Sequence, residues 1–164
     1  MPPSIETFIL DLSRYFETLS PSNLQTLEHF YTNDALFKDP FNDVIGIVAI
    51  KTIFQHMFET LDQPRFVITH QLFDSHQAFM CWDFLFSLKS APKKTYTVKG
   101  STHLLLETDS DGIVKIKSHR DYWDPAEEIY EKIPGIGSIF RWIKKKSTAP
   151  VAPASLSTAS VPRN

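Results

Sequence analysis

Residues 33–41 read N-D-A-L-F-K-D-P-F, and they place the carboxylate of Asp39 between Phe37 and Phe41, directly before Pro40. Proline restricts the residue before it to an extended backbone and removes one backbone hydrogen-bond donor. We therefore expect a short extended segment here, with the Asp39 side chain leaving the strand end in a fixed direction. Such a carboxylate is either a turn residue that caps backbone amides or an acid/base group on a pocket wall.

Helical spacing of apolar residues flanks this stretch on both sides. Before it, residues 4–19 carry an apolar stripe with Tyr15 at its edge. Ser20 followed by Pro21 is typical of a helix start, and predicts a second short helix that ends at residue 33. After the stretch, residues 47–61 are apolar over much of a helical surface, which predicts a third helix covered on more than one side.

The pattern changes from helical to strand-like after Pro64. Residues 65–73, 78–88, 95–106 and 112–123 alternate in polarity or are rich in β-branched and aromatic residues, with turn-forming residues between them. Three helices followed by four long strands predict an α+β domain with an antiparallel meander, strongly curved around the third helix. One face of this sheet would pack on the helices.

Two more helices are predicted after the strands. Pro125 at a first turn opens one that spans residues 126–133. Residues 136–146, from Ile136 to Lys146, form an apolar helix with a basic end. This last helix could attach to a membrane surface, but a lid over the edge of the fold is the favoured interpretation. Residues 147–164 are rich in Ser, Thr, Ala and Pro, and we expect a disordered tail.

Length and composition exclude several classes of function. The chain has 164 residues, 42% of them apolar, which predicts one domain over residues 1–146. A net charge of -2 lacks the basic excess of nucleic-acid binders. The single cysteine, Cys81, cannot form an intramolecular disulfide, and the histidines show no metal-ligand spacing, so neither a metal nor a cofactor is predicted. Charges interrupt the first twenty residues and no run could span a bilayer, so we expect a cytoplasmic protein.

Two local patterns within this layout resemble known families. Tyr15 in the first helix, followed by Asp39 before a proline, is similar to ketosteroid isomerase, whose oxyanion-hole tyrosine lies in the first helix and whose general-base aspartate precedes a proline. Residues 119–124, H-R-D-Y-W-D, resemble the end of the last strand in SnoaL-like proteins. Residues 4–146 thus resemble the nuclear-transport-factor-2-like (NTF2-like) superfamily. The resemblance implies a cone-shaped α+β barrel, with N-terminal helices packed in a curved antiparallel sheet and extra C-terminal helices.

The resemblance also implies a chemistry. A hydrophobic small molecule would enter the cone, Asp39 would move a proton without a cofactor, and Tyr15 would stabilise the resulting oxyanion, as in isomerases, lyases or hydrolases. In ketosteroid isomerase a second oxyanion donor is an aspartic acid held neutral. Here the matching position falls on Thr102 or His103, and this departure argues against steroid isomerisation. A non-catalytic module of the same fold, binding a ligand or a protein, is the alternative.

The last strand supplies a rival acid/base pair. Period two places His119, Asp121 and Trp123 on one face, whereas Val114 and Ile116 have the opposite parity. If those two aliphatic residues face the core, His119 and Asp121 reach the interior only through a β-bulge. We predict that His119 and Asp121 face inward as acid/base groups and that Trp123 contacts the ligand.

Other candidates lie on the central strands. Asp83 stands among aromatic residues, where a charge is costly unless it is paired or protonated, so it is either a second pocket acid or an ion-pair partner. Thr102 and His103 are candidate ligand contacts, although a lone strand histidine is more often structural. Outward-facing aromatics such as Trp82 and Phe84 would expose a large apolar area, which predicts a homodimer.

Overall fold

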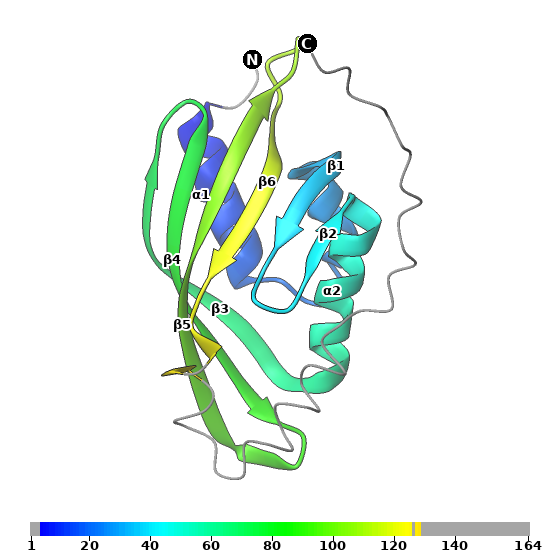
Figure 1. Ribbon diagram of the computed structural model, residues 1–164, viewed down its shortest axis with the longest axis vertical. Helices are drawn as coiled ribbons and strands as arrows, with labels where there is room; N and C mark the ends of the chain where they lie inside the picture. Colours follow the sequence, from blue (N-terminus) through cyan, green and yellow to red (C-terminus); the bar gives the residue numbers. More distant parts are fainter. Residues whose placement is uncertain (1–3, 126, 129–164) are drawn as a thin grey trace, which may run out of the picture.

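The computed structural model describes residues 4–125 and 127–128. The helices in this part are α1 (Ile5–Glu17), the 3-10 helix η1 (Leu24–His29) and α2 (Ile47–Thr60). The strands are β1 (Tyr31–Lys38), β2 (Asp43–Ile45), β3 (Leu61–Phe73), β4 (Gln77–Leu88), β5 (Ala91–Thr108) and β6 (Val114–Tyr122). They form one sheet in the order β2-β1-β6-β5-β4-β3 (Figure 1). The fold is therefore α+β, as predicted.

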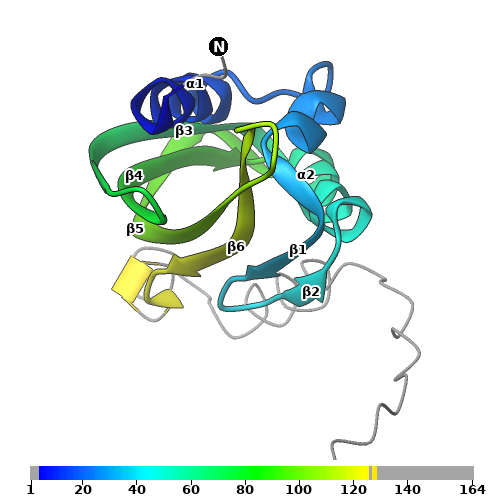
Figure 2. The ribbon, with the colours of Figure 1, turned by 90° about the horizontal axis from the view of Figure 1, so that it is seen from above.

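The sheet curls strongly without closing (Figure 2). Helix α1 packs on β3, and α2 contacts both edge strands, β2 and β3, so α2 bridges the open side of the curl. Apolar side chains from the two helices and from the inner face of the sheet form the main core. This arrangement is the cone-shaped barrel that the sequence resemblance implies, and it leaves a hollow between α2, the β1–β2 turn and the inner face of the sheet.

Local sequence signals account for both long helices. Ser4 caps α1, because its hydroxyl oxygen accepts a hydrogen bond from the Thr7 amide at 3.2 Å. Phe8, Leu12 and Phe16 lie on one face of α1 at helical spacing and are buried. Helix α2 starts after Gly46, whose φ of 99° lies in the region that favours glycine. The predictions for these helices are confirmed.

The segment between the two helices differs from the prediction. The expected second helix shrinks to η1, with Asn23 rather than Ser20 at its N-cap position, and β1 already begins at Tyr31. Tyr31 is fully buried and opposes Ile116 of β6 in a parallel pair, so tertiary pairing overrides the short helical pattern. With β1 and the three-residue β2 added, the sheet has six strands. It is a mixed sheet instead of a four-stranded antiparallel meander.

A bulge in β6 settles which side chains face inward. Leu105 opposes Ser118 while Leu106 opposes Ile116, so Lys117 is an extra residue without its own partner on β5. The extra residue reverses the alternation, and Ile116 and His119 both point into the core, with 0% and 3% of their surface exposed. This bulge is the condition that the sequence pattern requires for an inward His119.

The predicted outward position of two aromatic residues is wrong. Trp82 is only 6% exposed, and both Trp82 and Phe84 lie on the inner face of β4. Trp82 can lie flat across β5 because residue 100 is glycine. A Cβ atom at Gly100 would be 2.3 Å from the indole ring. The exposed apolar side chains on β3 and β4 are instead residues such as Leu72 and Phe79.

The predicted helix over residues 136–146, the tail over residues 147–164 and the domain end at residue 146 lie outside the described residues. So does most of the helix predicted over residues 126–133. At the start of this predicted helix, the Asp124 carbonyl accepts a hydrogen bond from the Glu128 amide at 2.9 Å. In the part of the chain that the structure describes, the helices are too short or too polar to cross a membrane.

Candidate active site

The hollow of the cone holds a pocket of about 170 Å³. Its wall is predominantly apolar, with aromatic and aliphatic side chains from β1, the β1–β2 turn, α2, β3, β4, β5 and the residue after β6: Phe37, Phe41, Ile53, Phe54, Met57, Leu61, Phe66, Trp82, Phe84, Phe86, Val98 and Trp123. The polar lining residues are Asp39, Asn42, His56, Thr60 and Asp121. An engineered apolar cavity of about 150 Å³ binds benzene, so this pocket has room for a substituted aromatic ring. An apolar pocket with few convergent polar groups is typical of small-molecule sites.

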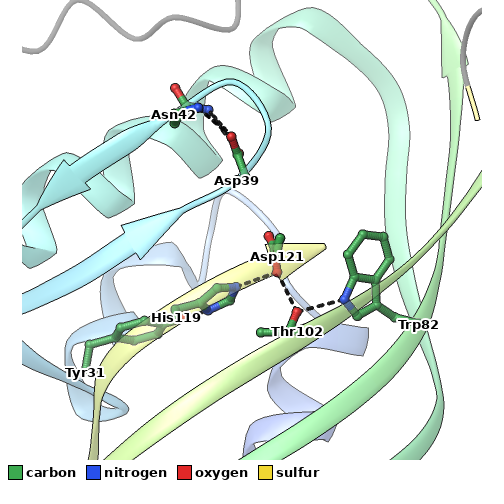
Figure 3. A network of polar contacts seen from close by, with 7 residues as sticks. All are labelled: Tyr31, Asp39, Asn42, Trp82, Thr102, His119 and Asp121. Atoms are coloured by element: carbon green, nitrogen blue, oxygen red, sulfur yellow. Dashed lines mark hydrogen bonds and ion pairs between the residues drawn. The ribbon is translucent and has the colours of Figure 1, made fainter. Parts of the chain in front are cut away.

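A buried chain of polar contacts ends at the pocket wall (Figure 3). The parallel pairing of β1 and β6 brings the Tyr31 hydroxyl to within 2.6 Å of His119 Nδ1. On the other side of the ring, His119 Nε2 lies 2.8 Å from Asp121 Oδ1. The ring of Phe37 packs against the imidazole, with 4.7 Å between the ring centroids. His119 is thereby fixed in position behind the carboxylate of Asp121.

The hydrogen bonds in this chain have one consistent direction. A carboxylate can only accept, so His119 Nε2 carries a proton and donates it to Asp121 Oδ1. Nδ1 of a neutral ring then accepts from the Tyr31 hydroxyl. Burial raises the pKa of the Tyr31 phenol well above its ordinary value, and the charge of Asp121 adds to this effect. Tyr31 therefore keeps its proton and serves as a donor.

A second branch reaches the same carboxylate oxygen from β4 and β5. The Trp82 indole N–H donates to Thr102 Oγ1 at 2.8 Å, and the Thr102 hydroxyl donates to Asp121 Oδ1 at 2.5 Å. Thr102 and Asp121 face each other across β5 and β6, and the indole reaches Thr102 by crossing Gly100. Asp121 Oδ1 thus accepts two hydrogen bonds.

The other oxygen of Asp121, Oδ2, takes no part in the polar chain. Within the described residues no hydrogen bond reaches Asp121 Oδ2, and Figure 3 shows this atom pointing away from the polar chain. Asp121 lines the large pocket, and it also lines a smaller cavity of about 20 Å³ next to His119 and Thr102. The smaller cavity has room for about one water molecule. Asp121 therefore combines a fixed position with an open acceptor.

Asp39 lines the same pocket but is engaged differently. Its Oδ1 accepts hydrogen bonds from the amides of Phe41 and Asn42 at 2.7 and 2.6 Å, and the Asn42 side chain donates to both oxygens (Figure 3). This is the turn geometry that an Asp-Pro sequence favours. Burial raises the pKa of the Asp39 carboxyl and the charge of Asp121 raises it further, while the hydrogen bonds from Asn42 and Phe41 act in the opposite direction.

Three of the predicted site residues lie away from the pocket. The Tyr15 hydroxyl donates to the Asn23 carbonyl at 3.1 Å, and burial raises its pKa. His103 stacks on Phe79 on the outer face of the sheet, with 4.3 Å between the ring centroids. Asp83 lies on that outer face too, opposite Lys99 of β5. Because none of the three lines the pocket, we leave Tyr15, Asp83 and His103 out of the candidate site.

Sequence reasoning also missed several residues of the site. Tyr31 was assigned to a helix, and its only signal was a large amphipathic residue at the start of a buried strand. Trp82 was expected on the outer face, although Gly100 on the neighbouring strand is a signal for a large ring lying across it. His56 on α2 also lines the pocket, and no sequence pattern indicated that position. Of the predicted site residues, Asp39, Asp121 and Trp123 line the pocket, and Thr102 and His119 line the smaller cavity that Asp121 also borders.

Comparisons with known proteins agree with this fold. The family model of the SnoaL-like domain matches residues 12–119. A solved structure from Shewanella putrefaciens, described as a SnoaL-like polyketide cyclase, shares 17% identity and a TM-score of 0.61 over 80% of this chain and 97% of that one. A Catenulispora acidiphila protein with a ketosteroid isomerase-like fold, in complex with trimethylamine, shares 14% identity and a TM-score of 0.58 over 79% and 92%.

A third structure, of TerC co-crystallised with polyporic acid, shares 13% identity and a TM-score of 0.59, with 84% of this chain and 95% of that one covered. At these identities the structures show the fold alone. Among curated proteins, none matches the chain in sequence.

Proposed function

This chain belongs to the SnoaL-like domain family, and from that premise we propose that it binds a small hydrophobic molecule in the pocket and transfers a proton at Asp121. The observation that carries the proposal is the asymmetry of this carboxylate. Its Oδ1 accepts two hydrogen bonds from inside the protein, whereas its Oδ2 accepts none within the described residues. A positioned carboxylate with one open oxygen at an apolar pocket has the features of a general base.

The pocket wall also restricts the class of ligand. Its charged lining residues within the described part of the chain are Asp39 and Asp121, both acidic. An anionic ligand would meet two like charges without a compensating cation, which is unfavourable where water is excluded. The ligand is therefore not an anion, and its apolar body packs on the aromatic side chains. The trimethylamine and polyporic acid complexes support small-molecule binding by other proteins of this fold.

The proposed reaction begins with removal of a proton by Asp121 Oδ2. The C–H electron pair stays with the substrate, and Asp121 becomes a neutral carboxylic acid that can return the proton at another position or lose it to water. His119 and Thr102 hold Oδ1 in place through both states. Asp39 is the second carboxyl of the pocket, and its hydrogen bonds from the Phe41 and Asn42 amides and from the Asn42 side chain hold it in its turn.

A generic proton-abstraction probe tests the proposal. In 5-nitrobenzisoxazole a base removes the C3 proton, the electron pair forms a nitrile, and the N–O bond breaks to release a coloured phenolate. We expect kcat/KM of the wild-type protein for this elimination to exceed the second-order rate constant of acetate at equal pH by about 10²-fold or more. Asp121→Asn should lose most of the acceleration, because the amide keeps the shape but not the basicity. Asp39→Asn should retain a larger share.

Equal rates for wild type and Asp121→Asn would exclude Asp121 as the base. A second function, ligand binding without chemistry, is favoured by one observation: the turn hydrogen bonds of Asp39 account for that residue without any reaction. Binding of the probe in the pocket without its elimination would identify this second function.

We also propose that the protein forms a homodimer through the outer face of the sheet. Leu72 is 76% exposed and opposes Phe79, which is 45% exposed, and Leu105 on β5 is also exposed beside them. Contiguous exposed apolar side chains on a sheet are typical of a protein interface. The proposed partner is a second copy of this chain, in line with the homodimer that the sequence predicts.

A further inference from the structure

Two carboxylates and two aromatic rings come together on one part of the pocket wall. Asp39 and Phe41 belong to the β1–β2 turn, whereas Asp121 lies near the end of β6 and Trp123 directly follows that strand. The Phe41 and Trp123 rings meet edge to face, with 5.3 Å between their centroids and 70° between their planes. This ring contact brings the turn and the strand end together, each with an acid two residues before its ring.

All four of these side chains line the pocket and keep part of their surface accessible. The Asp121 side chain is 17% exposed, and the polar chain uses only its Oδ1 atom. Figure 3 shows Asp39 on the turn above Asp121. Burial and then the charge of Asp121 raise the pKa of the Asp39 carboxyl, so the two carboxylates lie close enough to interact.

The amide, indole and hydroxyl donors of the wall are already used within the protein. Asn42 Nδ2 donates to both oxygens of Asp39. The Trp82 indole donates to Thr102, and the Thr60 hydroxyl donates to backbone carbonyls of its own helix. Asp39 Oδ2 accepts a single hydrogen bond, and no lysine or arginine lines the pocket in the part of the chain that the structure describes. The wall therefore offers a ligand negative charge and open acceptors.

An organic ammonium group matches this wall. Two like charges beside apolar side chains are costly without a counter-charge, and an ammonium group supplies both the charge and the N–H donors. The faces of aromatic rings attract the same group through their electron density. A metal ion fits less well, because among the described residues no group of three or more His, Cys, Asp or Glu side chains could hold one.

We propose that the ligand is a protonated amine with an apolar body, whose ammonium group pairs with Asp39 Oδ2 beside the Phe41 and Trp123 rings. The inference rests on the proposed function, because it names the substrate class of the same pocket. Asp121 Oδ2 then faces the carbon that loses its proton, so each carboxylate has its own role. The positive charge also favours the ionised form of Asp39, against the burial and the charge of Asp121 that raise the pKa of this carboxyl.

Benzylammonium and benzyl alcohol form a matched pair of probes for this inference. They share the same ring and nearly the same shape, but only the amine is charged at about pH 7. Isothermal titration calorimetry gives the affinity of each compound. We expect the wild-type protein to bind benzylammonium about tenfold more tightly than benzyl alcohol.

Three variants locate the source of this preference. Asp39→Asn should lose most of it through weaker benzylammonium binding, because the amide keeps the shape but not the charge. Trp123→Leu should weaken the binding of benzylammonium about threefold more than that of benzyl alcohol. The matched control is Asp43→Asn, which removes an exposed acid from β2 and should keep the whole preference. A full preference in Asp39→Asn would overturn the role of Asp39.

The wild-type comparison alone can overturn the inference, whatever the stability of the variants. Equal affinity for the two compounds, or tighter binding of benzyl alcohol, would exclude a protonated amine as the preferred ligand while binding in the pocket stands. Binding of neither compound would overturn the inference as well. The elimination probe is neutral, so its dependence on Asp121 tests the proposed function separately from this charge preference.

Discussion

At the scale of single residues, the sequence identified the two carboxylates of the pocket but not their different states. Asp39 stood out because a proline follows it, and its local turn follows from that dipeptide. The open oxygen of Asp121 depends on Thr102 and His119, which come from two strands, and on Tyr31, which comes from a third. Such a network depends on tertiary register and leaves no local pattern in the sequence.

The raised pKa of Asp39 predicts how stability depends on pH. Because the folded protein binds this proton more tightly than the unfolded chain, stability falls as pH rises from the ordinary value of 3.8 through the raised folded value. At pH values above the folded pKa, the folded protein bears the full free-energy cost of holding Asp39 in its ionised form. Asp39→Asn is neutral and still accepts the amide hydrogen bonds, so it avoids this cost.

We therefore expect the melting temperature of Asp39→Asn, relative to wild type, to be higher at about pH 7 than at about pH 4. Differential scanning calorimetry at both pH values measures this difference. A difference that does not change with pH would mean that Asp39 titrates in the folded protein as it does in the unfolded chain.

Gly100 is predicted to be essential for the position of Trp82. A Cβ at residue 100 would lie 2.3 Å from the indole ring, and the indole is fixed by packing and by its hydrogen bond to Thr102. Gly100→Ala should destabilise the protein by about 1–3 kcal/mol, as overpacking does elsewhere. Urea unfolding measures the change, and Ser101→Ala on the outer face is the control. Equal stability of both variants would show that the ring has room to move.

At the scale of elements, the helices and long strands were predictable and the register was not. The apolar stripes of α1 and α2 span several turns, so helical periodicity identifies them. The bulge at Lys117 adds one residue to β6, and alternation alone cannot locate an extra residue. The start of β1 at Tyr31 was not predicted, because the two adjacent aromatic residues Phe30 and Tyr31 fit the periodicity of a helix and that of a strand equally well.

Deleting Lys117 tests the role of the bulge. Without the extra residue, strict alternation still points both Ile116 and His119 into the core, because Ser118 then takes the single outward position between them. We therefore expect the deletion variant to keep its core and to melt close to Lys117→Ala. Lys117→Ala keeps the bulge and removes only the exposed ion pairs to Asp34 and Glu107, so its melting temperature should stay near wild type. A deletion variant that melts far below Lys117→Ala would contradict this account of β6.

At the scale of the whole molecule, the apolar outer face predicts self-association. The sequence predicts a dimer because Trp82 and Phe84 were expected on the outer face. Both side chains face the pocket instead, so other residues must form the interface. We expect light scattering to report a dimer for the wild type and a monomer for the double variant Leu72→Glu, Phe79→Glu. Leu10→Glu changes an exposed leucine of α1 and should remain dimeric. A monomeric wild type would remove the proposed interface.

The whole molecule also explains why fold was easier to predict than chemistry. The order of helices and strands determines a cone with an open side that α2 bridges, and many sequences satisfy that pattern. The proposed reaction depends on which oxygen of Asp121 lacks a hydrogen bond. A single altered hydrogen bond would change which oxygen is free to act as the base.

The most direct test of the account is a crystal structure of the protein with 5-nitrobenzotriazole. This compound has the shape of the elimination probe, carries an N–H where the probe has its reactive C–H, and does not react. We predict that it occupies the pocket with a ring nitrogen about 2.8 Å from Asp121 Oδ2. A compound bound only outside the pocket, or inside it with Asp121 Oδ2 left without a contact, would contradict the central claim.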